Sequence, residues 1–498
     1  MREIDRLTTR DHELSANQLM LNAAFRCFDE INYIFKGNLA GKKALILCGP
    51  GNNGGDGADL GMGLYQAGVH TDLVLLSRID AVHGAAGNVI SMVLGRVVED
   101  SKARDAGNPP ATRLTLRECP DEETWAKLAL TVADYDLVVD AMFGTGLTRP
   151  LSGIFLRAAD FMAHGRLVLS VDLPSGLNAD LNKPIGPTVQ ADITVTFTAP
   201  KIANVLPPAS RLNGKLVVGD IGSPKSLLDA TNPSLFLSDE DDARQWLVKT
   251  RYTPGSYKNT HGHVLVIAGS RGDTGAAVLC GDAAMRSGAG LVTVATAASA
   301  QSTIAATLMT EVMTRALAET DRGAVSDAAI DYALSLASRM DVIAIGPGLS
   351  SDDERTRRFV YSVVERRQTP VVIDADGLNC LANYSSKGWP EELRGSKQSP
   401  LILTPHQGEM LRLLGTTDKT VLDDRVAAVR DFAVKHNLIL VLKGERSLIG
   451  TPDGRVFINP TGNAGLGTAG AGDTLTGLIA GFIAQAHASL KADFDALG

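Results

Sequence analysis

Cysteine is scarce in this sequence, and long apolar runs are missing from it. The five cysteines stand singly, in neither a disulfide framework nor a zinc-ligand spacing. We therefore expect a reducing, cytoplasmic location. No apolar run approaches the ~20 residues of a membrane helix, and the first residues lack the apolar stretch of a secretory signal. We expect no membrane partner and no export.

Positive charge is also in short supply. The sequence has 48 lysines and arginines against 56 aspartates and glutamates, which gives a formal net charge of −8. This balance argues against nucleic acid or an anionic membrane as the main partner. Prolines number only 21, whereas glycine, at 50 of 498 residues, exceeds the usual share of about 7%. The glycines show no collagen-like period, so we assign them to loops and close packing.

Short apolar runs that end in glycine-rich or acidic turns dominate the rest of the pattern. Continuous apolar runs are typical of strands buried on both faces, as in parallel sheets. Helical stretches, for example 276–287 and 474–486, lie between the runs. The pattern therefore predicts repeated βαβ units and a doubly wound α/β class. The predicted strands are 43–48, 137–139, 167–171, 264–268, 342–345, 371–373 and 438–442.

A break near residues 222–245 indicates a domain boundary. Turn residues are followed there by an acidic cluster at 238–242, and the strand–turn pattern restarts at Val264. The length allows roughly three domains of about 150 residues or two large ones, and the break favours two. We expect an N-terminal domain at 1–225 and a C-terminal domain at 236–498, each with three αβα layers.

The first domain carries a glycine-rich segment, GPGNNGGDG, at residues 49–57 after a predicted strand. Glycines at a helix start let the backbone approach a ligand, and the free N–H groups there bind anions. Asn52, Asn53 and Asp56 add oxygen ligands that suit a cation or a ribose. The segment is neither a Walker loop nor a GxGxxG fingerprint. The alternative is a plain tight turn.

Two further strand ends in this domain carry carboxylates. Asp140 begins the segment DAMFGTGL, and Asp172 begins DLPSGLN. A lone Asp after a strand is often a helix N-cap. In open α/β sheets, however, ligands bind outside the carboxyl ends of the strands. Three oxygen-rich turns in one domain therefore favour a site.

Together with DITVTFTAPK at 192–201, these motifs resemble the NAD(P)H-hydrate epimerase domain over roughly residues 10–220. The resemblance implies a Rossmann-like fold and a potassium ion held by Asn53, Asp140 and Ser175. Ala24 stands where that family usually has a glycine. The resemblance also implies substrate contacts from Asn52, Asn53, Gly54, Gly55, Asp56, Gly144, Thr145, Gly146, Leu147, Thr148, Arg149, Pro150 and Asp172.

The expected chemistry assigns a proton shuttle to Asp172. Epimerising a hydrated dihydronicotinamide requires loss and return of a hydroxyl at a carbon bonded to the ring nitrogen. A carboxylate can carry that proton, while a cation and backbone amides fix the pyrophosphate and ribose. Thr145 and Lys201 are further candidates without an assigned role.

The second domain has an anion-binding pattern followed by an acid. Gly470, Ala471 and Gly472 precede Asp473 and a helical stretch. N–H groups of such a first turn, together with the helix dipole, attract a phosphate. Asp473 would repel that phosphate unless it deprotonates a hydroxyl that attacks the terminal phosphoryl group. The alternative, a small-residue helix packed on a neighbour, explains the glycines but not the acid.

The GAGD motif resembles the ribokinase-like fold, and the accompanying motifs GSRGDTGAA, IGPGL, DADGLN, LTPHQGE and KGERS resemble the ADP-dependent NAD(P)H-hydrate dehydratase. This resemblance implies that Ala276, Gly348, His406 and Asp473 contact the hydrated dinucleotide. It also implies that the nucleotide is held by Lys443, Gly444, Glu445, Arg446, Ser447, Gly470, Ala471 and Gly472.

Within the second domain, Asp473 is then expected to help the hydrate hydroxyl attack ADP. Departure of phosphate restores the dihydropyridine and leaves AMP. We expect Mg²⁺ on the nucleotide oxygens, whereas ADP as the donor is implied by the resemblance alone. In this hypothesis the first domain interconverts the R and S hydrates of NADH and NADPH, and the second dehydrates the S hydrate.

Two other functions are weighed against this metabolite-repair enzyme, for which we expect a homo-oligomer. One is a hydroxymethylpyrimidine or hydroxyethylthiazole kinase with a regulatory nucleotide-binding domain. The other is a nucleotide-sensing scaffold that binds a protein partner. The GNNGGDG domain and the segment 374–377 favour repair over the kinase, and intact Asp172 and Asp473 argue against the scaffold.

Overall fold

The computed structural model describes residues 2–12, 14–108, 110–248, 250–385 and 387–490. The chain forms two compact units, Met1–Asn232 and Pro233–Gly498. Both units are three-layer α/β structures built on a largely parallel sheet, so the predicted fold class is confirmed.

Unit 1 is built on a seven-stranded parallel sheet of order β3-β2-β1-β4-β5-β6-β7. The chain runs outward from β1 to one edge and then returns to β4 beside β1. Ligands bind at the carboxyl ends of strands around such a switch point. The strands are β1 (Lys43–Cys48), β2 (His70–Leu75), β3 (Leu114–Glu118), β4 (Leu137–Ala141), β5 (Val168–Val171), β6 (Ile193–Phe197) and β7 (Lys215–Gly219).

Both faces of the unit 1 sheet are covered by apolar packing. Along β1, Ala44, Ile46 and Cys48 belong to one apolar core, and Leu45 and Leu47 belong to another. This alternation places a core on each side of the sheet, as the continuous apolar runs predict. The helices of the unit are α1 (Arg2–Asp11), α2 (Ala16–Ile34), α3 (Asn52–Gln66), α4 (Gly84–Asp105), α5 (Glu122–Leu128), α6 (Ile154–Met162), α7 (Ile202–Val205) and α8 (Lys225–Ala230).

The glycines of the segment 49–57 are explained by packing. Helix α3 begins at Asn52, so most of the segment is helical and does not form a loop before the helix. A Cβ on Gly54 would lie 1.9 Å from the carbonyl oxygen of Gly49, and one on Gly57 would lie 2.3 Å from Cβ of Ala141. Only glycine lets α3 approach the strand ends this closely.

Unit 2 contains a ten-stranded sheet of order β11-β10-β9-β12-β13-β14-β15-β16-β17-β8. The strands from β11 to β15 are parallel, and β16 is antiparallel to both of its neighbours. The switch point lies between β9 and β12. The strands are β8 (Leu235–Leu237), β9 (His263–Ile267), β10 (Leu291–Ala297), β11 (Met313–Leu317), β12 (Val342–Ile345), β13 (Val371–Ile373), β14 (Leu401–Leu403), β15 (Ile439–Leu442), β16 (Leu448–Gly450) and β17 (Val456–Ile458).

Helices α10 and α17 pack closely in unit 2. A Cβ on Gly477 would lie 2.1 Å from the carbonyl oxygen of Cys280, and one on Gly481 would lie 1.8 Å from Oγ of Ser287. These contacts fix the start of α17 beside the sheet. The helices of the unit are α9 (Glu240–Val248), α10 (Thr274–Arg286), α11 (Ala298–Thr307), α12 (Ile330–Ala337), α13 (Glu354–Glu365), α14 (Asp376–Ser385), α15 (Gln407–Leu413), α16 (Arg425–His436) and α17 (Ala471–Leu490).

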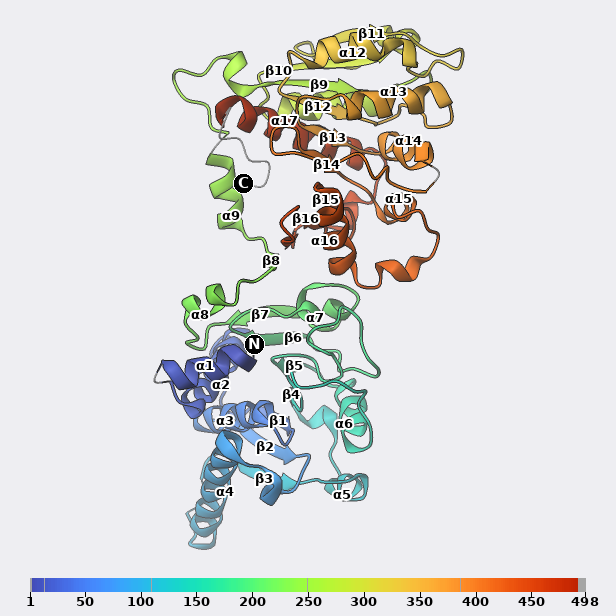
Figure 1. Ribbon diagram of the computed structural model, residues 1–498. Helices are drawn as coiled ribbons and strands as arrows, with labels where there is room; N and C mark the ends of the chain where they lie inside the picture. Colours follow the sequence, from blue (N-terminus) through green and yellow to red (C-terminus); the bar gives the residue numbers. More distant parts are fainter. Residues whose placement is uncertain (1, 13, 109, 249, 386, 491–498) are drawn as a thin grey trace. The chain divides into compact units, whose positions relative to one another are not determined.

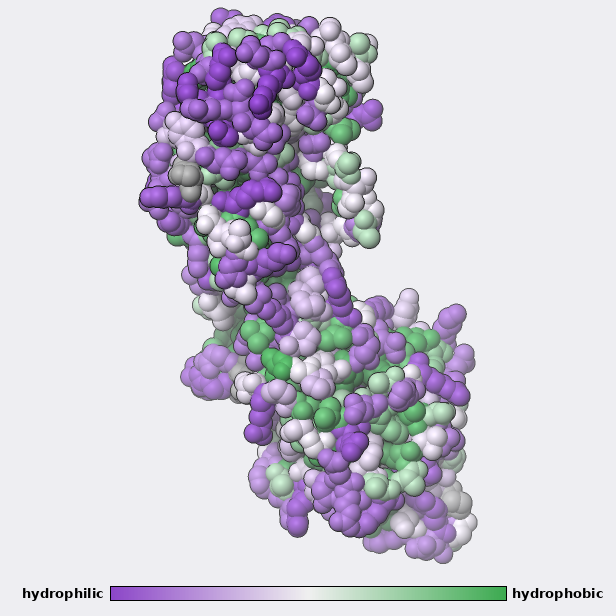
Figure 2. All heavy atoms as spheres, turned by 90° about the vertical axis from the view of Figure 1, so that its right-hand side faces the viewer, coloured by the Kyte–Doolittle hydropathy of each residue, from purple (hydrophilic) through white to green (hydrophobic). Residues whose placement is uncertain are grey.

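Hydrophilic residues cover much of the face shown in Figure 2, where hydrophobic residues form scattered patches. A search of the described helices finds none with the length and apolar character needed to cross a membrane.

Candidate active sites

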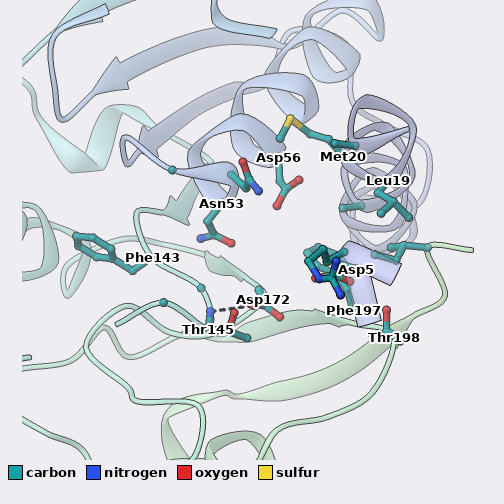
Figure 3. Close-up of a pocket in the computed structure, with 18 of the residues that line it drawn as sticks. Asp5, Leu19, Met20, Asn53, Asp56, Phe143, Thr145, Asp172, Phe197 and Thr198 are labelled. Atoms are coloured by element: carbon teal, nitrogen blue, oxygen red, sulfur yellow. Dashed lines mark hydrogen bonds between the residues drawn. The ribbon is translucent and has the colours of Figure 1, made fainter. Parts of the chain in front are cut away.

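Unit 1 has a cavity of about 650 Å³ at the carboxyl ends of its central strands. Its walls come from the start of α3, the turns after β4, β5 and β6, and helices α1 and α2 (Figure 3). The structure brings together here part of the predicted substrate-binding set, namely Asn52, Asn53, Asp56, Gly144, Thr145, Gly146 and Asp172.

Asp172 is held by a buried ion pair. Its Oδ1 accepts a hydrogen bond from Nζ of Lys201 at 2.6 Å, and the two side chains are only 12% and 6% exposed. Thr196 donates to the same oxygen at 3.1 Å, and the backbone N–H of Thr145 donates to Oδ2 at 3.2 Å. Asp172 also has a φ of +67°, a left-handed conformation that costs free energy for a non-glycine residue and is often found at functional sites.

Two further carboxyl groups line the same cavity, and no described residue forms an ion pair with either of them. Figure 3 shows Asp56 entering it from α3 and Asp5 from α1. Burial raises the pKa of Asp56 well above its ordinary value, and the nearby Asp172 carboxylate adds to this rise. Burial also raises the pKa of Asp5, against an opposing effect of Lys201. The cavity therefore combines an ion-paired carboxylate with two carboxyl groups whose pKa values are raised by burial.

Asp140 and Ser175 lie next to this cavity and are hydrogen-bonded to each other. The hydroxyl of Ser175 donates to Oδ1 of Asp140 at 2.6 Å, and the Ser175 backbone N–H donates to Oδ2 at 2.8 Å. Ser170 donates to Oδ2 at 2.9 Å. Asp140 is fully buried without a cationic partner among the described residues, and its burial raises the pKa of this carboxyl.

The other predicted substrate residues of unit 1 lie outside this cavity. Gly54 and Gly55 are buried against neighbouring elements. Leu147, Arg149 and Pro150 line a second cavity of about 440 Å³, and Phe143 lines both cavities. Thr148 is exposed and lines neither.

Sequence reasoning missed a wall of the first cavity. Asp5, Arg6 and Thr9 of α1 line it, as do Leu19 and Met20 of α2. The start of the chain shows only a short run of alternating charge, and this pattern is equally typical of an exposed helix that lines no cavity. Lys201 was considered from its motif but could be paired with Asp172 only in three dimensions.

In unit 2, Asp374 and Lys443 form an ion pair between the turns after β13 and β15, two strands that are separated by β14. Nζ of Lys443 donates to Oδ1 of Asp374 at 2.7 Å, and Asp374 is 1% exposed. The hydroxyl of Thr476 donates to Oδ2 at 2.7 Å. Nζ of Lys443 also lies 3.9 Å from Oε2 of Glu409. This network ties the predicted nucleotide loop to the first turns of α17.

Asp473 lies in the first turn of α17 beside that network. Burial raises the pKa of Asp473, and the carboxylate of Asp374 raises it further, while Lys443 opposes the rise. Gly470 has a φ of +85°, which favours glycine at the turn into the helix. Residues 461–469 before it are all exposed. In the predicted phosphate cradle, Gly470 directly precedes α17, and Ala471 and Gly472 are the first residues of that helix, so the cradle is a helix N-terminus approached by an exposed loop.

The predicted hydrate contacts His406, Ala276 and Gly348 occupy different settings in unit 2. Nδ1 of His406 accepts the backbone N–H of Gly408 at 2.9 Å and caps α15, and Nε2 lies 3.5 Å from Oε1 of Glu409, although the side chain is 55% exposed. A Cβ on Gly348, where φ is +63°, would lie 3.1 Å from Cβ of Ala276. Ala276 and Gly348 are therefore neighbours across two turns.

The loop at 443–447 is held from below by a buried arginine. Arg425 donates to the backbone carbonyls of Glu445 at 3.1 Å and Arg446 at 3.2 Å. Arg446 adopts a φ of +58°. Arg425 was not identified from the sequence, because nothing in its helical context marks it. Within the described ranges, no group of three His, Cys, Asp or Glu residues could hold a metal ion.

The sequence matches two family models and several characterised relatives. Residues 16–203 match the model of the YjeF-related protein N-terminus, and 264–497 match that of NAD(P)H-hydrate dehydratase. The chain is 40% identical to the bifunctional NAD(P)H-hydrate repair enzyme Nnr of Moorella thermoacetica over 97% of this chain and 87% of that protein. It is 35% identical to the Nnr of Thermofilum pendens over 88% of this chain and 78% of that protein.

Among solved structures, part of this chain is similar to the ADP/ATP-dependent NAD(P)H-hydrate dehydratase from Bacillus subtilis, co-crystallised with ATP/Mg²⁺. The identity is 31%, the TM-score is 0.42, and the alignment covers 52% of this chain and 85% of that one.

Proposed function

Because the chain belongs to the bifunctional NAD(P)H-hydrate repair enzymes, we propose that Asp172 and Asp473 carry out its two reactions. The chain is an enzyme of metabolite repair with an epimerase domain and an ADP/ATP-dependent dehydratase domain. The assignment of the chemistry to individual residues, the cofactors and the assembly form the proposal. We take residues 1–225 and 236–498 as the two catalytic domains.

For the epimerase, the observation that carries the proposal is the Asp172–Lys201 pair inside the first cavity. Lys201 keeps a charged carboxylate in a place from which water is largely excluded. The hydroxyl departs as water by taking a proton from the Asp172–Lys201 pair, and a planar iminium remains. Water then adds to either face of this iminium and returns a proton to the pair, so the two epimers interconvert.

A potassium ion fits the buried oxygens beside this cavity. Asp140 has no cationic partner among the described residues, its hydrogen-bonded neighbour Ser175 offers a further oxygen, and Asn53 lines the adjoining cavity. The side-chain amide of Asn53 is buried, and its Nδ2 has no hydrogen-bond partner within the described ranges. A monovalent cation would compensate the Asp140 charge and would orient the substrate's oxygen atoms when bound. Asn53, Asp140 and Ser175 are the residues proposed to hold it.

For the dehydratase, Asp473 is the proposed general base. It accepts the proton of the hydrate hydroxyl as that oxygen forms a bond to the terminal phosphorus of ADP, and AMP departs. The phosphate ester then leaves the ring carbon as a neighbouring C–H proton is lost, which restores the double bond. The N–H groups at Gly470–Gly472 bind the transferring phosphate, and residues 443–447 bind the rest of the nucleotide.

Magnesium, when bound, would neutralise charge on the nucleotide oxygens. The described residues hold no ready-made cluster of metal ligands, and Lys443 already pairs with Asp374. The donor chemistry therefore suits an ion carried mainly by the nucleotide. We propose ADP as the phosphoryl donor. Ala276, Gly348 and His406 are the proposed contacts to the hydrated ring.

We also propose a cytoplasmic location and a homo-oligomeric assembly. All five cysteines are buried and unpaired, which suits a reducing compartment. Light scattering coupled to size-exclusion chromatography measures the assembly.

The proposed function is tested by incubating the protein with mixed epimers of hydrated NADPH, Mg²⁺ and either ADP or ATP. With ADP, the near-ultraviolet absorbance of the dihydronicotinamide should return, and both epimers should be converted. Chelation of Mg²⁺ should stop the recovery but not the epimer exchange. Absence of recovery with either nucleotide would overturn the dehydratase proposal.

A further inference from the structure

The second cavity of unit 1 has no part in the chemistry assigned to Asp172. It has a volume of about 440 Å³ and lies between the turn after β4, the start of α5 and the start of α6. Phe143 lines it as well as the first cavity, so the two adjoin. A ligand bound in both cavities would have to pass Phe143.

Among the described residues that line the second cavity, the charged side chain without an ion-pair or hydrogen-bond partner is a cation, Arg149. Arg149 is exposed at the edge of this cavity, and no described residue forms an ion pair or hydrogen bond with it. The acids of the cavity are engaged elsewhere: Asp121 caps α5 by accepting the N–H of Thr124 at 2.7 Å, and Glu122 pairs with Arg157 at 3.0 Å. Arg149 is thus available for an anionic group of a ligand.

Aromatic rings and an open helix start complete this cavity. The rings of Phe143 and Phe155 lie 4.7 Å apart between centroids and are both partly exposed. Such rings offer a face on which a planar base can stack. Helix α6 begins here after Gly153 without a side-chain cap, so its first N–H groups add positive potential to that of Arg149.

The first cavity has the opposite character. Asp5, Asp56 and Asp172 line it, and Lys201 is the one buried cation among its described lining residues, with the exposed Arg6 at the rim. The uncapped start of α3 adds positive potential at one wall, but a phosphate beside the three carboxyls would be repelled. The adenosine end of a dinucleotide, with its phosphate, is therefore better placed beside Arg149.

We propose that the second cavity binds the adenosine half of the hydrated dinucleotide, with Phe155 against the base and Arg149 on a phosphate. The proposal rests on the epimerase function proposed for the first cavity. The phosphate is either the pyrophosphate, which both substrates carry, or the 2′-phosphate, which only the NADPH hydrate carries. In the second case Arg149 determines the preference between the two substrates.

Epimerisation kinetics of the full chain carrying Asp473→Asn test this proposal, because that background removes competing dehydration. The R hydrates of NADH and NADPH are supplied separately, and the epimers are resolved by chromatography. Arg149→Ala should raise KM about 10- to 100-fold, the loss expected for a hydrogen bond to a charged group, with little change in kcat. Phe155→Leu should raise KM several-fold for both substrates.

The two substrates identify the phosphate. An effect of Arg149→Ala on the NADPH hydrate alone assigns the 2′-phosphate, and an equal effect on both assigns the pyrophosphate. Arg166→Ala, at an exposed arginine that lines neither cavity, is the matched control and should leave both KM values unchanged. Unchanged KM values in Arg149→Ala or Phe155→Leu would overturn the inference while the epimerase proposal stands. A parent chain that fails to interconvert the epimers would instead overturn the epimerase proposal.

Discussion

Replacing Lys201 by methionine should destabilise unit 1 strongly, because it leaves a buried carboxylate without its cation. Nζ of Lys201 lies 2.6 Å from Asp172, and both side chains are largely buried. Removing one partner of a buried pair typically costs about 3–5 kcal/mol. The same loss is expected from Asp172→Asn, which leaves the lysine buried alone.

The double variant should recover a large part of this cost, because it removes both charges. The measured coupling between the two positions should be about 2 kcal/mol or more, well outside the error of additive sites. Denaturant unfolding can be followed by fluorescence in a Trp246→Phe, Trp389→Phe background, where Trp125 is the remaining tryptophan and reports on unit 1.

An exposed pair in the same unit is the control. Arg157 and Glu122 are 61% and 51% exposed, so Arg157→Ala should cost only about 0–1 kcal/mol. The reasoning is refuted if Lys201→Met costs no more than this control, or if the effects of Lys201→Met and Asp172→Asn simply add.

Three further predictions concern unit 2. Thr476→Val removes the hydroxyl that donates to Asp374 at 2.7 Å. The free energy of unfolding of unit 2 should therefore fall by about 1.5–3 kcal/mol, whereas epimerisation rates should not change. An unaltered unfolding midpoint would contradict this prediction. His406→Ala should lower the free energy of unfolding by about 1 kcal/mol because it removes the α15 cap, whereas His406→Asn should retain the cap. Both variants should raise the KM of dehydration. An unchanged KM would exclude contact between His406 and the hydrate. Burial raises the pKa of Asp473 above its ordinary value of 3.8, and a general base must be ionised. The kcat of dehydration should therefore begin to fall at a pH above 3.8 as the solution is acidified. A kcat that stays constant below that pH would argue against Asp473 as the base.

The sequence was sufficient to predict seven of the seventeen strands in the described ranges, together with their carboxyl-end turns; the other ten, among them the edge strands β3, β7, β8 and β11, were not predicted. The runs at 43–48, 342–345 and 371–373 coincide with β1, β12 and β13, because strands buried on both faces leave a continuous apolar signal. Asp172 and Asp140 could be identified as site candidates for the same reason, since each directly follows or ends such a strand.

The residues that pair with these carboxylates could not be predicted from the sequence, because the pairs form between distant segments of the chain. Lys201 reaches Asp172 across 29 positions, and Thr476 reaches Asp374 across 102. The glycines of the segment 49–57 were interpreted as a means for the backbone to approach a ligand, whereas α3 begins within the segment and several of them serve the close approach of α3 to the strand ends. Helix α1 lines the first cavity through Asp5, although it lies before the region matched by the family model.

The most direct test of two separate sites uses matched variants and the absorbance of restored NADPH. With mixed epimers and ADP, Asp473→Asn should abolish recovery and leave epimer exchange intact. Asp172→Asn should allow recovery only until the S epimer is consumed, and then stall. Full recovery by Asp473→Asn, or complete conversion of both epimers by Asp172→Asn at the parent rate, would contradict the assignment of the two reactions to these carboxylates.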